Sequence, residues 1–261
     1  MITKIETTDN LANDIKKALE PLGGMAAFVK PGDKVFIKPN FNTSDPPPAS
    51  TDIEFIRVVL REINAQKPAQ IILGEAPTVF GRSKKYFKEK NPEALKQEFP
   101  NLVVLYLPEE EWIQKEIPKG EFVKKASIPR ILEEVDKIIY LPCLKTHSIG
   151  QFTGALKLTV GLIKPSERFK MHAGHLQEKV AEFNLLVKPD LIIMDGRKCF
   201  IDHGPMNGTL REPKIILAST NRVELDIEAI KIIQTFPGNS LAGLDPLQLP
   251  QIKRATELGI K

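Results

Sequence analysis

Three basic side chains stand out in the stretch from Leu141 to Gly161, LPCLKTHSIGQFTGALKLTVG. Lys145, His147 and Lys157 lie among apolar, small and hydroxyl residues. Lysines in such surroundings suit the binding of an anion, and a histidine beside them suits proton transfer near neutral pH. A strand that ends at Leu141 and a helix that begins at Thr153 would place Lys145 and His147 in the loop between them. We therefore predict that Lys145 and His147 are catalytic and that Lys157 binds the substrate.

Polar side chains also stand at the ends of short apolar runs that have the composition of buried strands. Lys38 and Asn40 follow the first such run, Glu75 ends the second, and Asp195 follows the fifth. The carboxyl ends of parallel strands form the ligand crevice of an open sheet. We predict that Lys38 and Asn40 contact the substrate and that Asp195 acts as a general base or a metal ligand.

The segment MDGRKCFIDHGPMNGT, residues 194–209, is expected to be a tightly shaped loop between two strands. Its glycines and proline restrict the backbone strongly. We predict that His203 and Gly204 of this loop belong to the substrate-binding site.

Four further side chains are candidate metal ligands. Glu75 and Asp226 supply the carboxylates that Mg²⁺ prefers, and Asp226 also suits stabilisation of the helix dipole. His172 and His175 are three residues apart, so a helix would place both imidazoles on one side, where a transition metal binds. The glutamate of the HExxH motif is absent, and surface exposure of the two histidines is the alternative.

Short apolar runs alternate with amphipathic helical patterns along the whole chain. This alternation predicts one α/β domain over 1–261, with a mainly parallel sheet and helices on both faces. The basic run at 163–176 is expected to be an inserted loop or lid. The predicted strands cover 34–38, 70–75, 101–107, 137–141, 190–194 and 214–218. The predicted helices cover 9–20, 52–65, 91–98, 126–134, 153–162, 175–186, 222–235 and 246–258, and Thr51 with Glu54 is the predicted capping box of the second.

Composition narrows the class of partner. The 261 residues carry a net charge of +4, and basic residues alternate with acidic ones and lack interleaved aromatics, which disfavours nucleic acid. We expect a cytoplasmic protein without a membrane partner, because no signal peptide or membrane-spanning run is visible. The motifs GxGxxG, GxxxxGK[ST], GxSxG and CxxC are absent from the sequence.

Six short motifs occur in the order in which a known family has them. They are IKPNF at 37–41, GEA at 74–76, LPCLKTH at 141–147, TGALKLTVG at 153–161, MDG at 194–196 and HGPMNG at 203–208, and Asp226 follows. Together they resemble the domain of unknown function 362 family over about residues 33–235. The resemblance implies a site built from Lys38, Asn40, Glu75, Lys145, His147, Lys157, Asp195, Gly204 and Asp226.

The sequence departs from the family at two points. Many members carry an iron–sulfur segment, whereas Cys143 and Cys199 are the only cysteines here, too few for the four ligands of a cluster. We therefore expect no iron–sulfur cluster. The family usually has asparagine after the lysine of TGxLK, and this chain has Leu158.

Two functions fit these residues. The first is an enzyme that acts on a small anionic substrate, a carboxylate or a phosphate, with a divalent metal such as Mg²⁺ as a candidate cofactor. The second is a non-catalytic module that binds a ligand or metal, such as a sensor or carrier. Substitution of His147 or Asp195 separates them, because only an enzyme would keep its ligand and lose turnover.

Overall fold

The computed structural model describes residues 1–77 and 82–261; the side chains of Lys170 and His172 also lie outside the described part. Its strands are β1 (Ile2–Glu6), β2 (Lys34–Pro39), β3 (Gln70–Glu75), β4 (Leu102–Tyr106), β5 (Trp112–Glu116), β6 (Lys125–Pro129), β7 (Lys137–Leu141), β8 (Cys143–His147), β9 (Gln151–Phe152), β10 (Leu191–Phe200), β11 (Leu210–Arg211) and β12 (Ile215–Ser219). Its α-helices are α1 (Leu11–Leu19), α2 (Ile53–Asn64), α3 (Ser83–Lys90), α4 (Gly154–Leu158), α5 (Pro165–Arg168), α6 (Leu176–Phe183), α7 (Arg222–Gln234) and α8 (Pro250–Glu257).

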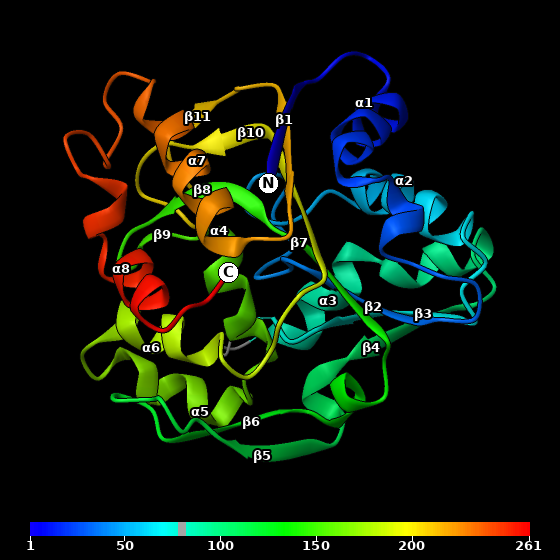
Figure 1. Ribbon diagram of the computed structural model, residues 1–261, viewed down its shortest axis with the longest axis horizontal. Coiled ribbons are helices and arrows are strands. Elements are labelled where there is room, and N and C mark those ends of the chain that lie inside the picture. The colour runs from blue at the N-terminus through cyan, green and yellow to red at the C-terminus, as the bar shows by residue number, and fades with distance from the viewer. Residues whose placement is uncertain (78–81) are drawn as a thin grey trace.

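The centre of the fold is a mostly parallel sheet whose main path runs β1-β12-β10-β7-β2-β3-β4. Strands β10, β7, β2, β3 and β4 run parallel to one another, while β12 pairs antiparallel with both β10 and β1. The shorter strands β8 and β11 pair with β10, and β9 pairs with β8. A separate antiparallel pair, β5 and β6, lies below the sheet in Figure 1.

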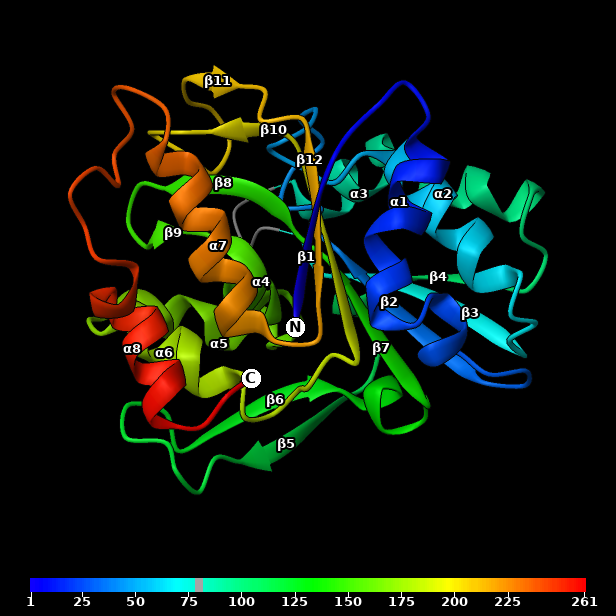
Figure 2. The same ribbon diagram turned by 45° about the horizontal axis from the view of Figure 1, so that its top comes forward.

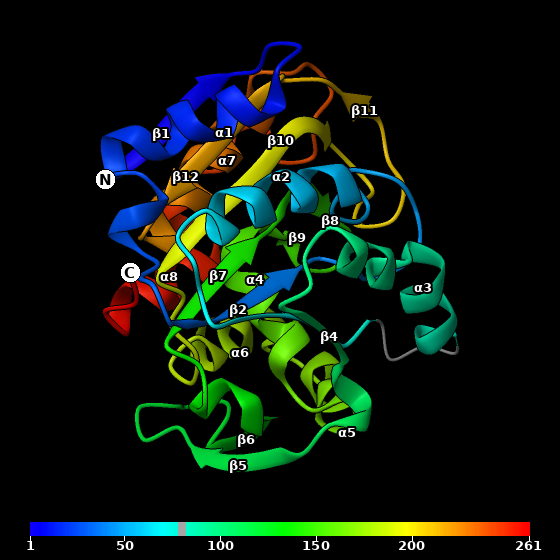
Figure 3. The ribbon, with the colours of Figure 1, turned by 90° about the vertical axis from the view of Figure 1, so that its right-hand side faces the viewer.

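Helices cover both faces of the sheet because its strands are apolar on both faces. Figure 2 shows α1 and α2 on one face and α4, α6, α7 and α8 on the other. Figure 3 shows the same two layers from the side of β4. In β2, Val35 and Ile37 belong to the core under α1 and α2, while Phe36 belongs to the core under the second layer. The predicted fold class, α/β with a mainly parallel sheet and helices on both faces, is confirmed.

Two predicted loops are strands in the structure. The chain passes from β7 through Pro142 directly into β8, so residues 143–147 do not form a strand-to-helix loop. The partner of β8 is the outer half of β10, which runs to Phe200 instead of ending at Met194. The prediction of a loop over 194–209 was therefore wrong for residues 194–200. These residues extend β10 beyond the main sheet, where β10 pairs with β8 and β11.

Several helix predictions also need correction. Residues 126–134 form β6 and a short 3₁₀ helix, and 92–97 is 3₁₀ rather than α-helical. The N-cap of α2 is Asp52, whose side chain accepts the Glu54 N–H, while the Thr51 hydroxyl donates to the Leu141 carbonyl. Within 163–176 the chain forms α5 and a 3₁₀ turn that continues toward α6. Among the described residues, no helix has both the length and the apolar character that crossing a membrane requires.

Candidate functional site

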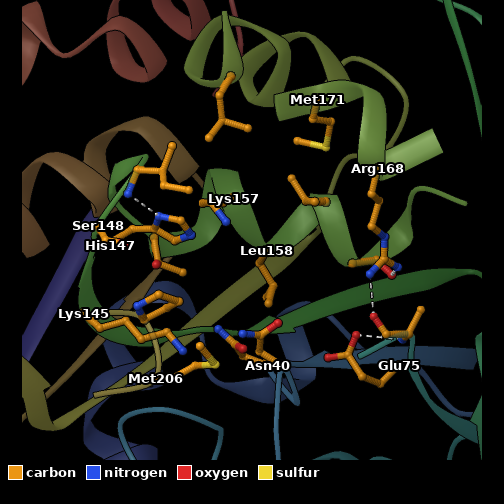
Figure 4. A pocket seen from close by; sticks show the side chains of 18 of the residues that line it. Asn40, Glu75, Lys145, His147, Ser148, Lys157, Leu158, Arg168, Met171 and Met206 are labelled. Atoms are coloured by element: carbon orange, nitrogen blue, oxygen red, sulfur yellow. Dashed lines mark hydrogen bonds between the residues drawn. The ribbon is translucent and has the colours of Figure 1, made fainter. Parts of the chain in front are cut away.

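A cavity of about 280 Å³ opens where β2, β3 and β8 end beneath α4 and α5. It collects side chains from distant parts of the chain, as Figure 4 shows for ten of them. Its lining consists of Lys38, Asn40, Asn42, Glu75, Ala76, Lys145, His147, Ser148, Ile149, Thr153, Lys157, Leu158, Val160, Gly161, Arg168, Met171, Leu176, Pro205 and Met206. Six of the residues selected from the sequence lie in this lining: Lys38, Asn40, Glu75, Lys145, His147 and Lys157.

Lys38 and Glu75 form a buried ion pair at the bottom of the cavity. The Nζ atom of Lys38 lies 2.5 Å from Oε1 of Glu75, and both side chains are almost fully buried. Glu75 also accepts the backbone N–H groups of Phe41 and Ala76. Burial lowers the pKa of Lys38, and Glu75 opposes that shift. A charge pair with this many hydrogen bonds offsets the cost of removing both groups from water.

Lys145 has no carboxylate within salt-bridge distance among the described residues. It is 0% exposed, and its Nζ donates to the carbonyl of Ala49 at 2.5 Å. Burial is the largest cause that lowers its pKa. The proline-rich segment that contains Ala49 thus orients this lysine, which lines the cavity.

His147 has a defined tautomer in its neutral form. Its Nδ1 accepts the backbone N–H groups of Ile149 and Gly150 at 3.2 and 2.9 Å. Because Nδ1 is an acceptor, the ring proton lies on Nε2. The tight turn after β8 therefore fixes both the orientation of the ring and the nitrogen that carries the proton.

Lys157 enters the cavity from α4. Its pKa is lowered from 10.5 to about 8, first by burial and then by the nearby charges of Lys145 and Arg168. Among the described residues, none forms a hydrogen bond or ion pair with its ammonium group. A lysine with this pKa titrates close to neutral pH, where a general acid or base works best.

Arg168, which the sequence analysis placed only within the basic run, is a further cation of the cavity. Its guanidinium donates to the carbonyls of Ile163, Ala76, Pro77 and Gly161 and to no carboxylate of the described residues. It is 7% exposed, and burial lowers its pKa to about 10. No motif marked this residue; only its position in the basic segment between α4 and α6 singled it out.

The charges of the cavity are strongly unbalanced. Four cationic side chains line it, Lys38, Lys145, Lys157 and Arg168, and Glu75 is the one acidic residue in the described lining. Glu75 is committed to Lys38. Within the described part of the chain, the other three cations have no carboxylate within salt-bridge distance, so the cavity carries an excess of positive charge that favours an anion.

Asp195 lies apart from this cavity. It stands within β10 rather than after a strand, and both of its oxygens accept hydrogen bonds from Arg197. It lines a different depression, together with Asp52 and Cys143. The structure therefore does not place Asp195 in the cavity with Lys145 and His147, because Asp195 lies within the extended β10, where it pairs with Cys143 of β8.

His203 and Gly204 do not line the cavity, although Pro205 and Met206 do. The His203 side chain is 83% exposed and lies 3.2 Å from Asp202. Gly204 packs against β8, where its carbonyl accepts the Ser148 N–H at 2.7 Å. A β-carbon at 204 would collide with the Thr146 carbonyl, so this position requires glycine for close approach of two backbones.

Asp226 is buried beneath α4, outside the cavity lining. Its two oxygens accept the N–H groups of Ala155 and Leu156 at 2.6 and 3.0 Å. Burial raises its pKa to about 7, and these two hydrogen bonds oppose the shift. Asp226 thus caps a neighbouring helix rather than its own, and positions the element that carries Lys157.

The candidate metal ligands whose side chains are described do not converge. Glu75, Asp195 and Asp226 face three different surroundings, and the described part of the chain contains no group of three or more His, Cys, Asp and Glu that would hold a metal ion. His175 is 61% exposed and stacks on Phe122. The side chain of His172 lies outside the described residues.

Comparison with known proteins agrees with the motif order. The family model described as "Domain of unknown function (DUF362)" matches residues 35–231. The protein belongs to this family. The matched region begins at β2 and ends within α7, so it contains every described residue of the cavity lining.

A thylakoid-associated protein of Synechocystis sp. is similar over nearly the whole chain. The two sequences are 29% identical over 260 residues, which cover 96% of this chain and 76% of the Synechocystis protein. The similarity therefore extends beyond the region that the family model matches.

Proposed function

We propose that this protein is an enzyme that acts on a small anionic substrate, a carboxylate or a phosphate, in the cavity beneath α4. The observation that carries the proposal is that Lys145, Lys157 and Arg168 line one cavity, whose acidic residue among those described, Glu75, is paired with Lys38. The lowered pKa of Lys157, about 8, agrees with this arrangement. An anion in the cavity would be held by Lys145, Lys157 and Arg168. Lys38 is paired with Glu75, so its charge is largely compensated. It helps to shape the cavity and does not bind the anion directly.

Proton transfer in the cavity falls to Lys157 and His147. The neutral amine of Lys157 takes a proton from the bound substrate, and its ammonium form returns one. His147 presents the ring nitrogen that carries the proton, because Nδ1 is occupied by two backbone donors. A catalytic role for Lys145 is to polarise the anion, as its burial and its hydrogen bond to Ala49 support. Asp195 has no part in this scheme.

A divalent metal such as Mg²⁺ stays a prediction, and the surroundings of Glu75 oppose it. The Glu75 oxygens already accept three hydrogen bonds, and the cations around them would repel Mg²⁺. Metal analysis of the purified protein, before and after dialysis against a chelator, tests this cofactor directly.

Binding of phosphate and acetate tests the first half of the proposal, that the cavity holds a small anion. Isothermal titration with inorganic phosphate and with acetate should detect binding of at least one of them. Lys145→Met and Lys157→Gln should weaken that binding by about tenfold or more, the worth of one charge-assisted hydrogen bond. Lys253→Gln, an exposed lysine on α8, is the matched control and should leave affinity unchanged.

Consumption of a substrate tests the second half of the proposal, that the protein is an enzyme. Incubation with a small-molecule cell extract, followed by mass spectrometry, should show one anionic compound consumed by the wild type. His147→Gln should retain phosphate or acetate binding and consume nothing. A wild-type protein that binds an anion and converts none would instead favour the non-catalytic binding module.

We also propose a cytoplasmic location, with peripheral attachment to a membrane as the alternative that the name of the Synechocystis relative raises. Cell fractionation with and without a high-salt wash distinguishes these two.

A further inference from the structure

The cavity has a second property besides its charge: its outer part is apolar. Ile149 is 63% exposed and Met206 is 50% exposed, and both line the cavity. They are among the six large hydrophobic side chains that are exposed in the described part of the chain. Exposed apolar side chains that gather at a cavity mark a ligand contact more often than scattered ones do.

The apolar lining continues inward from these two residues. Leu158 and Met171 are nearly buried, and Leu176 is half-buried on the same cavity. Figure 4 shows Leu158, Met171 and Met206 around the space into which Lys145 and Lys157 project. Lys145 is 0% exposed and Arg168 is 7% exposed, so these two cationic groups lie deep in the lining, and Lys157 is half-buried. Ile149 and Met206 form the solvent-exposed part of the same lining.

We propose that the substrate is an amphiphilic anion, in which a carboxylate or phosphate head carries an alkyl or aryl group. The head lies against Lys145, Lys157 and Arg168, and the apolar group lies against Met171, Leu158 and the exposed Ile149 and Met206. This inference rests on the proposed function and adds the class of substrate to it.

The volume of the cavity limits the size of that substrate. At about 280 Å³ it holds the equivalent of about nine water-sized groups. A phosphate monoester with four carbons, or a carboxylic acid with seven or eight, has about this number of non-hydrogen atoms. Free phosphate or acetate would leave the apolar part of the lining without contacts.

Two pairs of probes test this inference by isothermal titration: methyl phosphate against butyl phosphate, and acetate against octanoate. Each methylene removed from water tightens binding about fourfold, equivalent to about 0.8 kcal/mol. The longer member of at least one pair should therefore bind at least about tenfold more tightly than the shorter member.

The double variant Ile149→Thr/Met206→Gln should remove most of this gain and leave binding of the shorter member unchanged. Leu247→Gln, an exposed leucine outside the cavity lining, is the control and should keep the gain. Equal affinities within both pairs, with binding still dependent on Lys157, would overturn the amphiphilic substrate and leave the anion site standing. A gain that persists in the double variant would place the apolar group elsewhere and also overturn the inference. Failure of all four probes to bind would overturn both proposals.

Discussion

Lys157 destabilises the ligand-free protein, so its replacement by methionine should raise the melting temperature. In the folded chain the pKa of Lys157 is about 8, against 10.5 for an ordinary lysine. A difference of this size corresponds to about 3 kcal/mol of lost stability at pH 7. Methionine has a similar length and carries no charge, so Lys157→Met removes this cost and keeps most of the packing.

The effect has a defined pH dependence. Between pH 8 and 10.5 the unfolded chain binds more protons at Lys157 than the folded chain does, so wild-type stability rises with pH in that window. The advantage of Lys157→Met should therefore fall from about 3 kcal/mol at pH 7 to about 1 kcal/mol at pH 10. Below pH 8 the cost to the wild type is fully present, because the folded protein carries the charged lysine.

Differential scanning calorimetry at pH 7 and pH 10, in a buffer without phosphate or carboxylate, measures this difference. Lys157→Met should melt several degrees above the wild type at pH 7, at roughly 2–4 °C per kcal/mol for a chain of this size. Lys253→Met, on an exposed face, should melt with the wild type at both pH values. The reasoning would be refuted if Lys157→Met melted at or below the wild-type temperature at pH 7. It would also be refuted if the gain in melting temperature were as large at pH 10 as at pH 7.

Three other substitutions test the supports of the cavity. Glu75→Gln leaves Lys38 buried without its ion-pair partner, and urea unfolding should show a loss of about 3–5 kcal/mol; an unchanged midpoint would contradict the pair. Asp226→Ala removes both acceptors from the start of α4, which should cost about 1–3 kcal/mol per buried N–H and speed hydrogen exchange there, whereas unaltered exchange would argue against the cap. Gly161→Val introduces a β-carbon that would lie 2.6 Å from the Lys38 ammonium nitrogen. We expect this variant to lose about 1–3 kcal/mol of stability, measured as a lower melting temperature. An unchanged melting temperature would show that Lys38 can move away without cost.

The architecture of the sheet was largely readable from local patterns. Short β-branched runs such as 34–38, 70–75 and 137–141 are strands with nearly the predicted bounds. The reason is that a strand buried on both faces must be apolar at every position, which leaves an unambiguous signal. Edge and hairpin strands such as β1, β5 and β6 were missed, because half-exposed strands carry mixed polarity that also fits helices or loops.

Much of the cavity was selected from the sequence for a related reason. Lys38, Glu75 and Lys145 are charged residues directly at the ends of apolar runs, and the carboxyl ends of parallel strands meet at one edge. Arg168 was not selected as a site residue, since a buried arginine that donates only to backbone carbonyls has no sequence pattern of its own.

Residue types and spacing by themselves determined the fold class and the set of lysines placed at strand ends, and the resemblance of six ordered motifs indicated the family. The tertiary structure alone decided which polar residues share a cavity. Asp195 and Asp226 were candidate carboxylates of the site like Glu75, yet within the extended β10 Asp195 pairs with Arg197, and the packing of α7 on α4 makes Asp226 a helix cap. Whether a strand continues or ends depends on hydrogen-bond partners far away in the sequence, and that information is absent from any local pattern.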